Sequence, residues 1–241
     1  MKLLKHIPNT ITSLNLISGL LSILSALQGD IFYAGVFIFI AAIMDFFDGF
    51  AARLLHVVSP IGKELDSLCD VVSFGVAPGM IVFSILSTNS VAYEVGGVNV
   101  LPYVSFFIPV LSALRLANFN VDTRQSDSFI GLPVPANALF IASLAMLLSQ
   151  TVKVPYMNWM IDLFENSFVL IITSLLLSLL LVSPVHMFSL KIKNFSFKDN
   201  VVRYVFLILS ILLIFAFSFA AVPLIIVLYI AISIVVNYII K

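Results

Sequence analysis

The sequence predicts an all-α integral membrane protein with about eight transmembrane helices. Of its 241 residues, 61% are hydrophobic and only 10% are charged, and the mean hydropathy is +1.17. This composition is typical of membrane proteins and excludes a soluble domain with a large core. Apolar segments close to the length of about 20 residues that a helix needs to cross a bilayer recur along the chain.

Eight apolar segments are expected to form these helices. The first four are Ile7–Leu27, Ile31–Leu55, Gly62–Leu86 and Leu101–Asn118. The remaining four are Leu132–Gln150, Phe168–Val182, Val201–Phe219 and Ala221–Ile240. The last two are nearly continuous, and Pro223 marks the expected turn between them because proline is a strong helix breaker.

Residues that favour helix starts and bends support several of these boundaries. Pro8 suits the first turn of the first helix, which we expect to be retained because no small-x-small cleavage site follows it. Ser59 and Pro60 are typical of an N-cap and first helical residue before the third segment. Pro78 is expected to kink the third helix.

The basic residues predict the orientation of the chain in the membrane. If the N-terminus is cytoplasmic, every Lys and Arg except Lys153 lies on the cytoplasmic side, as the positive-inside rule requires. We therefore expect a multi-pass protein of the cell (inner) membrane, with both termini and the loop between the second and third segments in the cytoplasm. The net charge of zero gives no indication of nucleic-acid binding, and one cysteine excludes a disulfide framework.

One stretch, Asp45–Asp70, carries four aspartates inside or at the border of apolar segments: Asp45, Asp48, Asp66 and Asp70. A charged side chain at the bilayer centre costs about 2.5–3.5 kcal/mol on insertion scales, so acids in such positions indicate function. A helix–helix polar contact is the ordinary explanation for one such residue, but it does not account for four at regular spacing.

The spacing places these aspartates on two helical stripes. At about 100° per residue, the members of each stripe fall within an arc of about 100°. The stripes are Asp45, Asp48, Gly49 and Ala52 in the second segment, and Gly62, Asp66, Asp70, Ser73 and Ala77 in the third. A short loop joins the two segments, which predicts an antiparallel hairpin with the carboxylates facing each other.

Carboxylates gathered in a partly dry site repel one another unless a cation compensates them. The two stripes contain no histidine, and Cys69 is the chain's only cysteine, so all-oxygen ligation favours Mg²⁺, Mn²⁺ or Ca²⁺. Gly49 and Gly62 allow a ligand to approach the helix backbone closely, while Arg53 and Lys63 suit phosphate groups. The stretch therefore predicts a pyrophosphate site, with an ion pathway as the open alternative.

The pattern Asp45-x2-Asp48-Gly49-x2-Ala52-Arg53-x8-Gly62-x3-Asp66-x3-Asp70 resembles the signature of the CDP-alcohol phosphotransferases at all eight fixed positions. The resemblance implies a six-helix catalytic core, here residues 1–183, followed by a basic cytoplasmic loop and two additional helices in residues 184–241. It further implies that Asp45, Asp48, Asp66 and Asp70 hold two divalent ions, Mg²⁺ or Mn²⁺. Asp70 is also the implied catalytic base, and members often form homodimers.

Three further segments resemble the membrane-embedded phosphatidylserine synthase branch of this family. They are Asp70-Val71-Val72-Ser73-Phe74-Gly75-Val76-Ala77-Pro78, Leu114-Arg115-Leu116-Ala117-x-Phe119-Asn120 and Phe129-x-Gly131-Leu132-Pro133-x-Pro135-Ala136. The resemblance implies CDP-diacylglycerol and L-serine as substrates, with the lipid tails in the bilayer and CMP released. Other acceptors remain open at this point, namely glycerol 3-phosphate, inositol phosphate or ethanolamine, as does a cation transporter that uses the acidic cluster.

The resemblance also assigns substrate contacts. Those expected for the nucleotide and lipid substrate are Asn9, Thr12, Gly49, Ala52, Arg53, Gly62, Lys63 and Ser73. No separate motif marks the acceptor pocket; for the serine acceptor we expect Arg115, as the partner of the serine carboxylate, and Asn120. Helix capping or interhelical bonding is an equal alternative for Asn9 and Thr12, and extension to the membrane interface is the alternative for Arg115.

Overall fold

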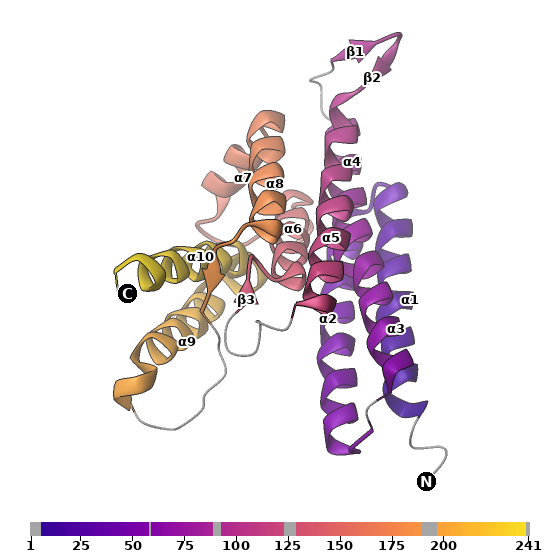
Figure 1. Cartoon of the computed structure of the whole chain (residues 1–241). Helices are drawn as coiled ribbons and strands as arrows, with labels where there is room; N and C mark the ends of the chain where they lie inside the picture. The colour runs from indigo at the N-terminus through magenta and orange to yellow at the C-terminus, as the bar shows by residue number, and fades with distance from the viewer. Residues whose placement is uncertain (1–5, 58, 89–92, 123–128, 189–196, 240–241) are drawn as a thin grey trace.

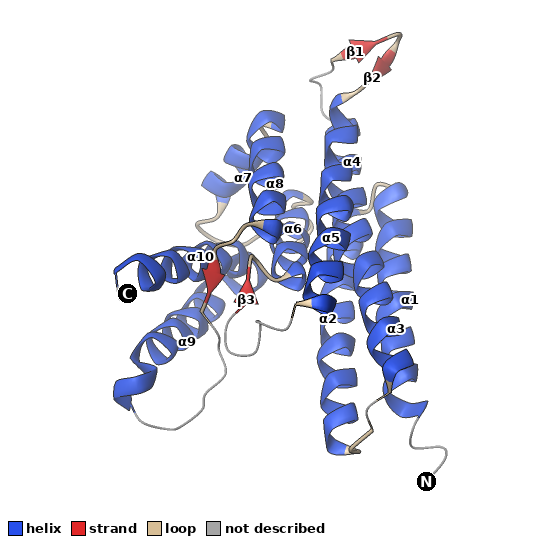
Figure 2. Ribbon diagram, viewed as in Figure 1, coloured by secondary structure: helices blue, strands red, loops and turns tan. Residues whose placement is uncertain are grey.

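The computed structural model describes residues 6–57, 59–88, 93–122, 129–188 and 197–239, and these residues are almost entirely helical (Figures 1 and 2). The α-helices are α1 (Ile7–Leu27), α2 (Ile31–Leu54), α3 (Pro60–Asp70), α4 (Ala77–Thr88), α5 (Phe107–Val121), α6 (Val134–Leu148), α7 (Asn158–Phe164), α8 (Ser167–Val182), α9 (Phe197–Phe217) and α10 (Val222–Ile239). Short π- or 3₁₀-helical segments are η2 (Val71–Val76), η3 (Leu101–Phe106) and η4 (Ser218–Ala221). Two small antiparallel pairs join β1 (Glu94–Val95) to β2 (Val98–Asn99) and β3 (Phe129–Ile130) to β4 (His186–Met187).

The expected all-α membrane fold is confirmed. Within the described residues, five helical stretches are long and apolar enough to cross a bilayer, and the α7–α8 pair, bent by 88°, raises the number to six. The number differs from eight for two reasons. Helix α6 has only 15 residues, and α9 with α10 forms one apolar stretch, Asn200–Val236. Most of α6 is buried against other helices, so protein rather than lipid surrounds it.

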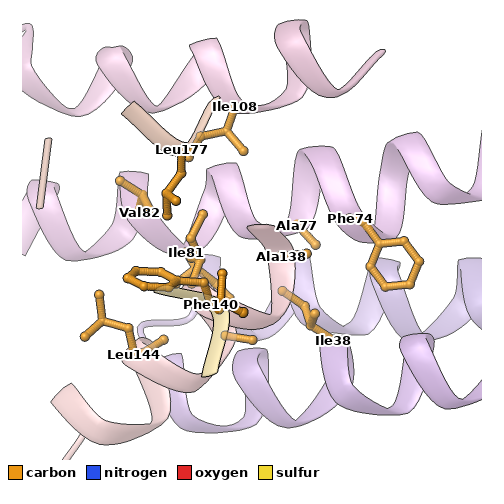
Figure 3. Packing of buried hydrophobic residues seen from close by; sticks show 14 of the residues in the cluster. Ile38, Phe74, Ala77, Ile81, Val82, Ile108, Ala138, Phe140, Leu144 and Leu177 are labelled. Carbon is orange, nitrogen blue, oxygen red and sulfur yellow. The ribbon is translucent and has the colours of Figure 1, made fainter. Parts of the chain in front are cut away.

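Helices α1 to α5 lie side by side, and α6 packs against α2, α4 and α10 (Figure 1). The buried core joins side chains of η2 with those of several helices, among them α2, α4, α5, α6 and α8, and it includes Ile38, Phe74, Ile81, Ile108, Phe140, Leu144 and Leu177 (Figure 3). Lipid is as apolar as these side chains, so close packing rather than the hydrophobic effect holds membrane helices together. At Gly75, an added Cβ would lie 3.1 Å from the Ser112 Cβ, so α5 can approach η2 this closely only because the residue is small.

The α2–α3 hairpin forms as expected. The Ser59 hydroxyl caps α3 by accepting from the Gly62 N–H at 3.1 Å, and Pro60 occupies the first turn. Near Pro78, where a kink is expected, the structure has the π-helical segment η2 immediately before α4, and Pro60–Thr88 forms one continuous helical stretch. Pro78 lacks the N–H that would close an α-helical bond to Phe74, which explains a wider turn at this point.

The C-terminal helices turn earlier than expected. The turn is η4, where Ser218 has a φ of +53°, whereas Pro223 lies in the first turn of α10. The Phe206 and Tyr229 rings have centroids 5.9 Å apart, so α9 folds back against α10. Both helices lie at the flank, oblique to α1–α5 (Figure 1). Several residues used for the orientation lie outside the described part: Lys2, Lys5, Arg124, Lys191, Lys193 and Lys241.

A substitution at Gly131 tests how closely β3 packs against the end of α8. Its φ is +78°, its N–H donates to the Val185 carbonyl at 2.8 Å, and a Cβ at this position would collide with the Leu181 carbonyl. We predict that Gly131→Ala lowers the free energy of unfolding by about 2–5 kcal/mol, from left-handed strain plus overpacking.

Gly97→Ala is the matched control. Gly97 has a φ of +81°, but an added Cβ would meet no described atom within 4 Å. Only the left-handed strain of about 1–2 kcal/mol applies there. Thermal unfolding of the two variants in detergent checks the prediction, and equal losses would contradict it.

Candidate active site

Three aspartates converge where the end of α2 meets α3. Asp45, Asp48 and Asp66 each offer a carboxylate oxygen, and these oxygens lie within 4.8 Å of one another. The sequence spacing explains the convergence, because residues three and four apart share a helix face and the hairpin turns the two faces together. Asp48 is buried, while Asp45 and Asp66 are half-buried.

The cluster is suited to a metal ion. Among the described residues, neither Asp48 Oδ2 nor Asp66 Oδ1 has a hydrogen-bond partner, although both atoms are buried. Buried like charges without partners are costly, and a divalent cation would supply the missing positive charge. A donor set of carboxylate oxygens suits hard cations such as Mg²⁺, Mn²⁺ or Ca²⁺.

Asp70 is not one of the three aspartates whose oxygens lie within 4.8 Å of one another, although it interacts electrostatically with all three. It is the last residue of α3 and is 8% exposed, and it accepts a hydrogen bond from the Asn15 amide nitrogen at 3.1 Å. The three-aspartate cluster therefore contains three of the four expected acids, and the fourth is held by α1 one helical turn beyond Asp66. This difference in surroundings distinguishes Asp70 from the other aspartates.

A pocket of about 240 Å³ opens beside the cluster, with Asp48 and Asp66 in its wall. Six of the expected substrate contacts line it: Asn9, Thr12, Gly49, Ala52, Gly62 and Lys63. A Cβ added to Gly49 would meet no described atom within 4 Å, so the backbone there is open to a ligand. Gly62 is packed more tightly, since its Cβ would lie 3.1 Å from Asn9 Oδ1.

Two expected nucleotide contacts do not line this pocket. Arg53 is exposed in the last turn of α2. Ser73 is fully buried in η2, and its hydroxyl donates to the Asn15 backbone carbonyl at 3.0 Å.

The two expected acceptor contacts lie in different surroundings. Asn120 is joined to α3, because its side-chain amide donates to the Ser67 hydroxyl at 2.9 Å and its backbone carbonyl accepts from Lys63 Nζ at 3.3 Å. Arg115 is 5% exposed, and its guanidinium carbon lies 5.3 Å from the Phe119 ring centroid. Protein therefore encloses most of its side chain.

Arg115 lines a second pocket of about 470 Å³ between the end of α5, β3 and the end of α8. Asn118, Asp122 and Ser183 contribute polar groups to its wall. This pocket shares no lining residue with the one beside the aspartates.

Sequence reasoning missed several residues of the site. Val57 and Ser59 line the first pocket, and Asn15 holds Asp70. The spacing could have indicated Asn15, because Asn9, Thr12 and Asn15 recur every three residues along one face of α1. The loop residues Val57 and Ser59 follow no such period.

The fold and site together define a helical membrane protein with an acidic, metal-suited pocket at the end of a helical hairpin. The chain belongs to the CDP-alcohol phosphatidyltransferase family, a family of transferases, because the family's sequence profile matches residues 5–180. The family expected from the aspartate pattern is thereby confirmed.

Curated relatives agree with this assignment. The CDP-diacylglycerol–serine O-phosphatidyltransferase of Bacillus subtilis is 42% identical over 132 residues, which are 55% of this chain and 71% of the relative. The enzyme of the same name from Helicobacter pylori strain J99 is 37% identical, over 58% of this chain and 57% of the relative. The archaetidylserine synthase of Methanothermobacter thermautotrophicus is 37% identical, over 57% of this chain and 56% of the relative.

The aspartate cluster predicts stabilisation by divalent ions. A ligand that binds only the folded state at 100 times its Kd stabilises the protein by about 2.7 kcal/mol. We predict that Mn²⁺ or Mg²⁺ raises the thermal midpoint of the wild type and that Asp66→Asn removes this response. Without ions, Asp66→Asn should be no less stable than the wild type, because it relieves repulsion.

Glu64→Gln is the control for this measurement. Glu64 is an exposed acid on the same helix outside the cluster, so its removal should leave the ion response intact. An ion response that survives Asp66→Asn would argue against a metal site between α2 and α3.

Proposed function

We propose that the chain transfers the phosphatidyl group of CDP-diacylglycerol to the hydroxyl of L-serine and releases CMP. The observation that carries the proposal is the pocket beside Asp48 and Asp66, which opens at the hairpin that bears the complete eight-position family pattern. The names of the relatives from Bacillus subtilis and Helicobacter pylori support serine as the acceptor.

In this proposal, the residues that line the pocket contact the nucleotide end of the substrate. Gly49 and Ala52 leave room for a flat or phosphorylated group close to α2, while Asn9 and Thr12 offer polar groups from α1. Lys63 lines the same pocket, and its ammonium group suits a phosphate oxygen. Arg53 belongs to the proposed set from outside the pocket wall, whereas Ser73 is left out of it because its buried hydroxyl donates to the Asn15 carbonyl.

Metal binding completes the charge balance of this site. Asp45, Asp48, Asp66 and Asp70 would hold the divalent ions, two Mg²⁺ or Mn²⁺ by the family resemblance. When bound, such ions neutralise the diphosphate and make CMP a better leaving group. The aspartates then serve to hold positive charge at one fixed place beside the pocket.

Asp70 is the proposed general base. The serine hydroxyl oxygen attacks the phosphorus that carries the lipid, the bond from that phosphorus to the CMP oxygen breaks, and the hydroxyl proton passes to the Asp70 carboxylate. A carboxylate is a weak base for an alcohol, so proton removal should come late in the step. The position of Asp70 outside the three-aspartate cluster supports a separate role.

The serine carboxylate is proposed to bind Arg115, with Asn120 as a second acceptor contact. A guanidinium group binds a carboxylate through paired hydrogen bonds, and the enclosed position of Arg115 strengthens such a contact. Asn120 supports a link to the reacting site because it is hydrogen-bonded to α3.

We further propose that the protein is a homodimer of the cell inner membrane, with its active site and both termini in the cytoplasm. The distribution of basic residues supports this orientation, and bacterial relatives support the inner membrane. Residues 1–183 form the proposed catalytic core, and residues 184–241 add the basic loop and the last two helices.

We predict that the purified protein releases CMP from CDP-diacylglycerol when serine and Mg²⁺ or Mn²⁺ are present. Asp70→Asn should lower kcat by about 100- to 10,000-fold, the usual contribution of a general base, with CDP-diacylglycerol binding changed little. CMP release and binding of labelled CDP-diacylglycerol measure the two effects.

Asp162→Asn, an exposed acid on α7, should leave both quantities unchanged. Loss of binding in Asp70→Asn as large as in Asp45→Asn would make Asp70 mainly a metal ligand. A panel of glycerol 3-phosphate, inositol phosphate and ethanolamine tests the acceptor, and ion flux in liposomes without CMP release would indicate a transporter.

The acceptor proposal has its own test. Arg115→Ala should raise the KM for serine by about tenfold or more, because a charged hydrogen bond is lost, while the KM for CDP-diacylglycerol changes little. Arg203→Ala removes an arginine from α9, outside both pockets, and serves as the control. Equal effects of Arg115→Ala on the two KM values would remove Arg115 from the acceptor site.

A further inference from the structure

Asn15 lies on α1, and its side chain is hydrogen-bonded to Asp70, the last aspartate of the family pattern. Its amide nitrogen donates to Asp70 Oδ1 at 3.1 Å, and the Asn15 side chain is fully buried. The amide must present its NH₂ group to the carboxylate, since its oxygen would repel it. The contact therefore fixes the orientation of both side chains.

A second contact joins the same two helical segments. The Ser73 hydroxyl donates to the backbone carbonyl of Asn15 at 3.0 Å. One turn further along α1, a Cβ on Gly19 would lie 2.7 Å from the Ser73 Cα, so the two backbones are as close as glycine permits. The backbone of Asn15 is thus held against η2 while its side chain holds Asp70.

The position of Asp70 in its own helix makes this outside support important. Asp70 ends the α-helix α3, and the π-helical segment η2 begins at the next residue. A change from α to π winding alters the direction in which successive side chains point. The lateral bond from Asn15 supplies an orientation that the change of winding does not fix by itself.

The oxygen of the Asn15 side-chain amide also indicates that the bond to Asp70 is the reason for an asparagine here. Asn15 Oδ1 is buried and has no hydrogen-bond partner among the described residues. An apolar side chain of similar volume would avoid the cost of burying that oxygen. The bond from the amide nitrogen to Asp70 is therefore the function that accounts for asparagine at this place in α1.

We propose that Asn15 is a positioning residue for the reaction: it holds Asp70 Oδ1 so that Oδ2 is the oxygen that accepts the acceptor's proton. Ser73 acts behind it by fixing the backbone of Asn15. The inference rests on the proposed function, because it assigns Asn15 a role through Asp70, and it goes beyond the aspartate pattern that identifies the family.

Asn15→Leu is the main test because it keeps the branched shape and the number of side-chain heavy atoms and removes the donor. We expect kcat for CMP release to fall by about 10- to 100-fold, the usual effect of losing a residue that orients a functional group. The KM values for serine and CDP-diacylglycerol should stay within about threefold. Ser73→Ala, which removes the supporting bond, should lower kcat by about 2- to 10-fold.

Ser22→Ala is the matched control. Ser22 is also a fully buried polar residue of α1, and its hydroxyl donates to the Ala34 carbonyl at 2.7 Å, away from the aspartates. Its loss tests the structural effect of removing a buried hydrogen bond from the same helix. We expect kcat of this variant within about twofold of the wild type.

Three results would overturn the proposal: unchanged kcat in Asn15→Leu, a raised KM for CDP-diacylglycerol at unchanged kcat, or an equal fall of kcat in Ser22→Ala. If Asn15→Leu does not fold, as judged by size-exclusion chromatography in detergent, the kcat of Ser73→Ala decides. A kcat that is unchanged, or that falls no further than in Ser22→Ala, overturns the proposal. Wild-type protein that releases no CMP with any acceptor refutes the proposed function instead, whereas active wild type with active Asn15→Leu refutes only the positioning role.

Discussion

The main physical constraint on this structure is the mutual repulsion of carboxylates placed where two membrane helices meet. Asp45, Asp48 and Asp66 bring oxygens within 4.8 Å of one another, and two of these oxygens are buried without hydrogen-bond partners in the described residues. Packing alone would not bring them together, since neutral side chains would fill the same space at lower cost. The arrangement is physically reasonable if positive charge enters the cluster, and the pocket beside it leaves room for an anionic group.

The surrounding helices keep this unfavourable cluster in place. The Ser59 cap fixes the start of α3, and the short loop after α2 sets the register between the two stripes. Helix α1 closes one side of the site, where Asn9 and Thr12 line the pocket and Asn15 bonds to Asp70. Functional groups held by regular helices are positioned more rigidly than groups on loops, which suits a reaction that requires in-line geometry.

The second pocket shows how the later part of the chain contributes. Arg115 on α5 meets β3 and the end of α8, and the β3–β4 pair brings residues near 130 and 186 together. Gly131 permits this arrangement through its positive φ and its close contact with the Leu181 carbonyl. An acceptor held there would be recognised by residues that lie far from the aspartates in sequence, so acceptor choice could change without altering the aspartate hairpin.

The sequence alone determined the membrane class, the helical segments and the aspartate stripes, because apolar length and helical periodicity are local properties of the chain. Six of the substrate contacts expected from the sequence line the first pocket. Gly49, Ala52 and Gly62 accompany the aspartates at fixed spacing, Lys63 follows Gly62, and the family resemblance indicated Asn9 and Thr12. Only the tertiary structure decided the rest: that Ser73 faces Asn15 rather than the pocket, that Arg115 has a pocket of its own, and that the last turn is at Ser218–Ala221. Those outcomes depend on which helix faces pack together and on a change from α to π winding. Residue spacing within a single helix specifies neither of these, because both arise from contacts between distant parts of the chain.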